Sequence, residues 1–170
     1  EVSRLSSLID TNQLAASRLD STQVALQELS SLSNELMSAL TTAISTAGDT
    51  RIVENQATSV LSAMTAILNT NFNGEYIFAG INTDVKPFSD FLDAGSPNRV
   101  AFENEFNAFT FSNPITAGEM NAFLDTIETM FTSTGWEDWS KATNEEITSR
   151  ISLTETAKTS VSANISGIKE

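Results

Sequence analysis

The sequence contains no cysteine and no histidine. These absences exclude thiolate and imidazole nucleophiles, the most common general base of enzymes, and the two commonest zinc ligands. Disulfide bonds are impossible, so cysteine usage says nothing about the redox compartment. Only an enzyme built on carboxylates, Ser, Lys or Tyr would remain, and a carboxylate-only hydrolase is the one form we consider. We therefore expect no enzyme, no catalytic residue, no cofactor and no metal site.

Basic residues are scarce, and long apolar runs are missing. The 170 residues include 9 basic and 22 acidic side chains, which gives a formal net charge of −13. Such a chain repels phosphate backbones, which argues against nucleic acid as a partner. No stretch reaches the roughly 18 apolar residues of a membrane span, and the first residues do not resemble a signal peptide. The chain begins with Glu, so we expect a fragment of a longer protein.

Aromatic residues and prolines are absent from both ends of the chain. All thirteen aromatic residues lie between Phe72 and Trp139, and all three prolines lie within the same range. Residues 1–71 and 140–170 contain neither class. This change in composition divides the sequence into two flanks and a centre.

The first flank has the pattern of one long helix. Apolar residues occupy nine of twelve positions in a seven-residue repeat: Leu5, Leu8, Asn12, Ala15, Leu19, Thr22, Leu26, Leu29, Ser33, Leu36, Leu40 and Ala43. This repeat predicts an apolar stripe that needs a partner helix. The polar residues Asn12, Thr22 and Ser33 interrupt the stripe. They either fix register and partner choice or face a polar group or water, and the sequence leaves both interpretations open.

Two further helices are expected in the flanks. Gly48 and Asp49 indicate a helix end followed by a new N-cap, and an amphipathic pattern predicts a second helix over 50–70. In the last flank, Thr143 and Glu146 have the spacing of a capping box. Heptad spacing then continues to the chain end through Ile147, Ile151, Thr154, Lys158, Val161, Ile165 and Ile168, with the polar Thr154 and Lys158 as interruptions. This pattern predicts a third long helix.

The centre has the signals of a mixed insert. The stretches 75–80 and 99–111 are rich in aromatic and β-branched residues and predict strands, with turn residues between them. Thr116 and Glu119 form a second capping box before an amphipathic helix. We predict a mainly α protein, an elongated bundle of long coiled-coil-like helices with a small β-containing (α+β) insert. Residues 1–71 and 140–170 would form a discontinuous helical rod domain, and 72–139 the insert with a short covering helix.

Three features of the centre could bind a ligand, and each has a structural interpretation that we favour. The glycines at 74 and 80 lack the GK[ST] of a phosphate loop, so a turn is preferred. Glu103 and Glu105 would share one face of a strand and could bind a cation, but a solvated face is preferred. Trp136 and Trp139 flank two acidic residues and could bind a sugar, but packing against the bundle end is preferred.

The sequence that follows the second helix, "LNTNFNGEYIFAGINTDVKPF", resembles a known family. It is similar to the flagellar hook-associated junction proteins of the FlgL type, which are relatives of flagellin. Flagellin has a similar Asn-Gly turn but usually lacks the continuation "FAG…T…PF". The residues that match the family motif are Asn71, Gly74, Tyr76, Phe78, Ala79, Gly80, Thr83, Pro87 and Phe88.

The resemblance implies a rod-like structural subunit of the bacterial flagellum, exported by the flagellar type III apparatus and located outside the cell. Its partners would be the neighbouring junction protein on the hook side, flagellin, and an export chaperone that binds a missing C-terminal segment. We expect a core fragment that lacks the terminal polymerisation segments and is monomeric. Two alternatives stay open: a flagellin that forms the filament itself, and an acidic coiled-coil sensory or adhesin ectodomain.

Overall fold

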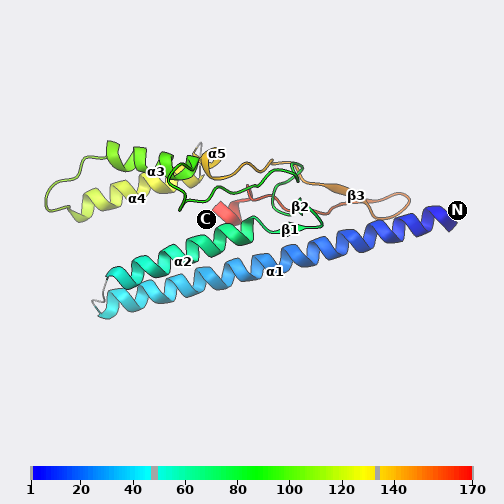
Figure 1. Cartoon of the computed structure of the whole chain (residues 1–170), viewed down its shortest axis with the longest axis horizontal. Coiled ribbons are helices and arrows are strands. Elements are labelled where there is room, and N and C mark those ends of the chain that lie inside the picture. The colour runs from blue at the N-terminus through cyan, green and yellow to red at the C-terminus, as the bar shows by residue number, and fades with distance from the viewer. Residues whose placement is uncertain (1, 47–49, 133–134, 170) are drawn as a thin grey trace.

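The computed structural model describes residues 2–46, 50–132 and 135–169, and it is mainly helical and elongated (Figure 1). None of the helices in these ranges is both long and apolar enough to cross a membrane. The elements in chain order are α1 (Val2–Thr46), α2 (Thr50–Leu68), β1 (Asn71–Phe72), β2 (Glu75–Tyr76), α3 (Pro97–Ala108), α4 (Ala117–Thr132), α5 (Trp136–Trp139), β3 (Thr148–Arg150), β4 (Thr156–Lys158) and α6 (Ser166–Lys169).

The two predicted N-terminal helices are confirmed, and they form an antiparallel helical hairpin. Helix α1 has 45 residues, which corresponds to roughly 65–70 Å at the rise of an α-helix. Helix α2 lies along the half of α1 that carries residue 46 (Figure 1). The proposed stop and N-cap at Gly48 and Asp49 lie outside the described residues. The wider apolar stripe of α2 suits its contacts, because Leu68 and Met64 also pack against the core of the insert.

The seven-residue stripe of α1 describes the contacts only in part. Leu29 is buried as expected, but Leu5 and Leu19 remain 53% and 39% exposed. The buried positions Arg18 and Ala25 lie between the predicted ones. A straight α-helix drifts relative to a strict seven-residue repeat, so its covered face moves away from the predicted positions along its length.

The third long helix predicted for the last flank is wrong. Strands β3 and β4 pair there as an antiparallel hairpin in which Ser149 faces Ala157, and only the short helix α6 follows. The hairpin lies along the N-terminal half of α1 (Figure 1), where Asn12 Nδ2 donates to the Ile151 carbonyl at 2.9 Å. A hairpin therefore covers the part of α1 that α2 does not reach.

The proposed capping box of the last flank is absent. Glu146 instead forms an ion pair of 2.5 Å with Lys158 on β4, and Thr143 bonds to a segment far away in sequence. The two residues therefore have separate roles: Glu146 contacts the β3–β4 hairpin, and Thr143 makes a long-range contact. The heptad pattern in this flank was misleading because Thr148, Thr154 and Thr156 also favour extended structure.

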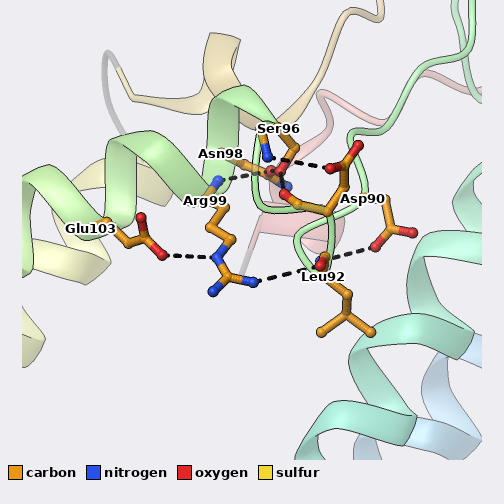
Figure 2. A network of polar contacts seen from close by, with 8 residues as sticks. Asp90, Leu92, Ser96, Asn98, Arg99 and Glu103 are labelled. Atoms are coloured by element: carbon orange, nitrogen blue, oxygen red, sulfur yellow. Dashed lines mark hydrogen bonds and ion pairs between the residues drawn. The ribbon is translucent and has the colours of Figure 1, made fainter.

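The strand predicted for 99–111 is also wrong, because residues 97–108 form α3. Ser96 occupies the N-cap position and Pro97 the first helical turn, where its missing N–H costs nothing. Figure 2 shows the polar network at this helix start, in which the fully buried Asn98 accepts from Ser96 Oγ at 2.6 Å. Arg99 then pairs with Glu103 at 2.8 Å, four residues further along the helix. Glu103 and Glu105 therefore do not share a strand face, and the cation site proposed from that geometry is not formed.

The helix predicted after Pro114 is confirmed together with its capping box. Thr116 Oγ1 accepts from the Glu119 N–H at 3.3 Å, and the Thr116 N–H donates to Glu119 Oε2 at 2.8 Å. Ser112 Oγ donates to the same carboxylate at 2.7 Å. The hydrogen bonds from Ser112 and Thr116 lower the pKa of Glu119 to about 2.

The aromatic residues form two connected groups. Phe123 of α4 is contacted by the rings of Phe102, Phe106, Phe109 and Phe111, with centroid distances of 5.5–6.1 Å. A second group surrounds Trp139, which stacks on Phe91 at 5.4 Å and contacts Phe131 at 4.7 Å. Phe91 joins the two groups through its edge contact with Phe102. The insert is thus held together by aromatic packing, and the second group attaches it to the helical hairpin.

Candidate functional site: the connection between rod and insert

The segment that follows α2 begins with a tight hairpin. Strands β1 and β2 pair Phe72 with Glu75, and the two residues between them are Asn73 and Gly74, with φ of 53° and 88°. Two consecutive positive φ values are the signature of a type I′ turn, for which Asn-Gly is the preferred pair. The Gly74 N–H donates to Oδ1 of Asn71 at 2.8 Å, which closes the turn. The predicted turn is confirmed, although it reverses the chain within a hairpin rather than at the helix end.

Residues 77–80 then run through the centre of the protein, fully buried. The Ile77 N–H donates to the Thr70 carbonyl at 3.1 Å, which ties the segment to the end of α2. The Phe78 carbonyl accepts from the Ala163 N–H at 2.8 Å, and the Ala79 carbonyl from the Thr143 N–H at 3.1 Å. Phe78 and Ala79 have no exposed surface, and their backbone groups therefore need these partners. Tyr76 is only half-buried, so Phe78 is the first fully buried aromatic residue of the chain.

Position 80 requires glycine for two reasons, its backbone conformation and the lack of room for a side chain. Its φ is +69°, a region that side chains disfavour. A Cβ atom at this position would lie 2.6 Å from the carbonyl oxygens of both Thr143 and Glu145. The hydroxyl of Thr143 accepts from the next backbone N–H, that of Ile81, at 2.9 Å. The chain of the last flank thus passes directly over Gly80.

The rest of the motif returns the chain to the end of α2. The Thr83 carbonyl accepts from the Tyr76 N–H at 2.8 Å, and the Pro87 carbonyl accepts from the Lys141 N–H at the same distance. The Phe88 ring packs against Trp136 with centroids 5.6 Å apart. The residues of the motif all lie in one continuous segment between the end of α2 and the start of α3, and this segment is the connection: Asn71, Gly74, Tyr76, Phe78, Ala79, Gly80, Thr83, Pro87 and Phe88.

Three asparagine or threonine side chains that the sequence did not link to this segment hold it in place. Asn69 bonds both backbone groups of Phe88, and Thr143 bonds the Ile81 N–H. Asn164 accepts from Trp136 Nε1 at 2.7 Å and donates to the Ala142 carbonyl at 2.8 Å. Their partners lie 19 or more residues away, so no local pattern could reveal them.

An ion pair between a buried arginine and a half-exposed glutamate joins the hairpin to α1. Arg18 Nη1 donates to Glu75 Oε2 at 2.6 Å, and the whole Arg18 residue is only 8% exposed. Its Nε and Nη2 atoms are buried without a hydrogen-bond partner. A buried guanidinium without a carboxylate partner destabilises the folded state. Glu75 therefore offsets part of the cost of burying the Arg18 charge.

The tryptophans are core residues, as favoured from the sequence. Trp136 and Trp139 are each 5% exposed, and their rings contact those of Phe88 and Phe131. Ligand binding by an exposed tryptophan pair is therefore not supported. Among the described residues, no group of three acidic side chains is arranged to hold a metal ion. The contacts of the connection hold the segment after α2 against the end of α2 and against the last flank.

Apolar surface is left on the rod beside this connection. A groove of about 590 Å³ runs between the helical hairpin and the insert. Its apolar lining includes Leu26, Leu61, Met64, Phe131 and Ile168. Further along α1, large apolar side chains are exposed at Leu5, Ile9, Leu14, Val24, Met37 and Ile44. Surfaces of this kind are typical of proteins that pack against other proteins.

Comparison with known families gives a match over residues 1–83. The family described as bacterial flagellin N-terminal helical region matches residues 1–83, which contain α1, α2, the β1–β2 hairpin and the buried segment 77–80. Comparisons with curated proteins and with solved structures returned no match. The matched region thus includes both helices of the rod and most of the connection to the insert. The match makes this part of the chain, just under half of its 170 residues, similar to the N-terminal helical region of flagellin.

Proposed function

We propose that the chain is a hook–filament junction subunit of the bacterial flagellum, which links the hook to the flagellin filament. The observation that carries the proposal is the motif from Asn71 to Phe88, including the continuation "FAG…T…PF" that resembles junction proteins. The match to the flagellin N-terminal region supports the broader class. The motif residues make the backbone contacts and the tight packing around Gly80 described above, which is consistent with a structural role for the motif.

The shape and surfaces of the protein support this function. The long helix α1 provides a stiff element, and the exposed apolar residues along it provide lateral surfaces for neighbouring subunits. The insert is small and lies to one side of the rod (Figure 1). In the proposed arrangement the rod packs against the hook-side junction protein and the first flagellin ring, while the insert faces outward.

The proposal includes an extracellular location and a set of partners. The subunit would be exported by the flagellar type III apparatus with the help of an export chaperone. Its neighbours would be the hook-side junction protein and flagellin. The domain division stays part of this proposal, with residues 1–71 and 140–170 as the rod domain and 72–139 as the insert, although the last flank contributes a hairpin rather than a helix.

Localisation tests the proposal. A labelled antibody against the insert should mark one band at the base of each filament. Marking along the whole filament would instead identify a filament-forming flagellin. A signal confined to the cell envelope, with no flagellar labelling, would favour a sensory or adhesin ectodomain. Deletion of the parent gene should release filaments from the hook, and a deletion strain that retains normal filaments would contradict the proposal.

A further inference from the structure

The turn of the β1–β2 hairpin places two mutually reactive residues at an exposed position. Asn73 and Gly74 are both exposed and form the one Asn-Gly pair in the sequence. The backbone nitrogen of a residue can attack the side-chain carbonyl carbon of a preceding asparagine. Glycine allows this most readily, since it has no side chain to hinder the approach. The pair is therefore a candidate for spontaneous deamidation, one reason why asparagine counts as a heat-labile residue.

The reaction is balanced by water and a base from the solvent. A base removes the amide proton of Gly74, and a bond forms between the Gly74 nitrogen and Cγ of Asn73. The bond between Cγ and Nδ2 then breaks, and Nδ2 takes a proton from the protonated base and leaves as ammonia. Water then opens the cyclic imide at one of its two carbonyl carbons, which leaves aspartate or isoaspartate at position 73. Nothing is oxidised or reduced.

The structure holds the attacking nitrogen in a hydrogen bond. The Gly74 N–H donates to Oδ1 of Asn71 at 2.8 Å. The reaction requires loss of this proton and a turn of the nitrogen toward Asn73, and both steps break the bond to Asn71. We propose that Asn73-Gly74 is a deamidation site of this protein and that the Asn71 side chain slows the reaction in the folded chain.

The modification would act on the attachment of the hairpin to the rod. The hairpin pairs Phe72 with Glu75 around a two-residue turn. Isoaspartate adds a carbon atom to the backbone of this turn, and such a turn no longer fits the pairing. Glu75 carries the ion pair of 2.6 Å with Arg18 of α1. Formation of isoaspartate at position 73 is therefore expected to weaken that ion pair.

Peptide mass spectrometry of the purified chain during incubation at mildly alkaline pH measures the reaction. Loss of the Asn71 hydrogen bond in Asn71→Ala should speed deamidation at position 73 by about five-fold, the factor that corresponds to one ordinary hydrogen bond. Asn71→Asp keeps an acceptor oxygen and should react as slowly as the wild type. In urea, where the turn is unfolded, the wild type and Asn71→Ala should react at the same rate.

An Arg18→Met variant separates the effect of Asn71 from general loosening of the hairpin. This variant removes the ion pair and keeps Asn71, so it should deamidate at about the wild-type rate. An Arg18→Met rate as high as that of Asn71→Ala would overturn the proposal, as would equal rates for folded wild type and Asn71→Ala. If Asn71→Ala does not fold, the deamidation rates of the folded and the urea-unfolded wild type are compared instead. A folded wild type that reacts as fast as the urea-unfolded chain would also overturn the proposal.

Discussion

The side chain of Asn69 pairs with both backbone groups of Phe88. Its Oδ1 accepts from the Phe88 N–H at 2.9 Å, and its Nδ2 donates to the Phe88 carbonyl at 3.0 Å. The amide thus replaces a neighbouring strand at the point where the insert returns to the end of α2. The two residues are 19 positions apart, so this contact closes the loop that contains the family motif.

Replacement of Asn69 should be costly because two backbone groups would lose their partner together. We expect Asn69→Ala to lower the free energy of unfolding by about 2–4 kcal/mol, from two part-buried hydrogen bonds and their desolvation. Urea denaturation followed by tryptophan fluorescence measures this change. Asn34→Ala is a matched control, since Asn34 is exposed and bonds only within α1. Similar costs for the two variants would contradict the role assigned to Asn69.

The glycines of the motif should differ sharply in their tolerance of a side chain. Gly80→Ala places a Cβ against two backbone carbonyls and should cost about 3 kcal/mol or more, or prevent folding. Gly74→Ala has a similar positive φ but open space around it, so we expect about 1 kcal/mol. Gly118→Ala in α4 also meets open space and should stabilise by about 0.5–1 kcal/mol. Thermal unfolding of the three variants checks this order, and a tolerated Gly80→Ala would be incompatible with the close approach of Thr143.

The two partners of the Arg18–Glu75 ion pair should respond differently to replacement, because only Arg18 is buried. Glu75→Ala leaves the Arg18 guanidinium buried and without a carboxylate, which should cost about 3 kcal/mol. Arg18→Met removes the buried charge and keeps much of the apolar stem, so its cost should be about 1 kcal/mol or less. The double variant should match Arg18→Met. Equal costs for the two single changes would show that the buried charge does not dominate.

Glu119 should make stability depend on pH at the start of α4. Its pKa is about 2 in the folded chain, below the ordinary value of 4.5, so folding favours the ionised carboxylate. The resulting stabilisation is complete above about pH 4.5 and is lost as the pH falls toward 2. The difference in unfolding free energy between the wild type and Glu119→Gln should therefore be constant at neutral pH and shrink over this window. Denaturation curves at several pH values test this, and a difference that does not change with pH would refute it.

The long helices were predictable because each has a sustained local pattern. The first 46 residues contain no proline and no glycine, and their apolar spacing needs no knowledge of the tertiary contacts. The capping box at Thr116 and Glu119 was equally local. The turn at Asn73-Gly74 follows from the conformational preference of that pair. These features depend on residues within four positions of one another, and the structure bears out each of them.

The wrong helix in the last flank and the wrong strand over 99–111 arose where aromatic or apolar spacing fits more than one structure. In 99–111, Phe102 and Phe106 are four apart, and Pro97 stands at a helix start, which are helical signals that the aromatic content outweighed. In the last flank, the isoleucine spacing suggested a helix, whereas tertiary contacts with α1 and the buried segment select a hairpin. The bonds of Asn69, Thr143 and Asn164 to the connection depend on the fold and could not be read from the sequence.

The burial of residues 77–80 has a consequence for the order of events in folding. Helices α1 and α2 are close in sequence and can pair early in folding. The Ala79 carbonyl, in contrast, has its hydrogen-bond partner in Thr143, 64 residues later. The partner of the Phe78 carbonyl, the Ala163 N–H, lies even further along the chain. A chain that ended before residue 143 would have a paired helical hairpin, but the carbonyls of Phe78 and Ala79 would have no hydrogen-bond partner from the last flank. Completion of the polypeptide thus converts an independent helical hairpin into a locked rod with a fixed insert.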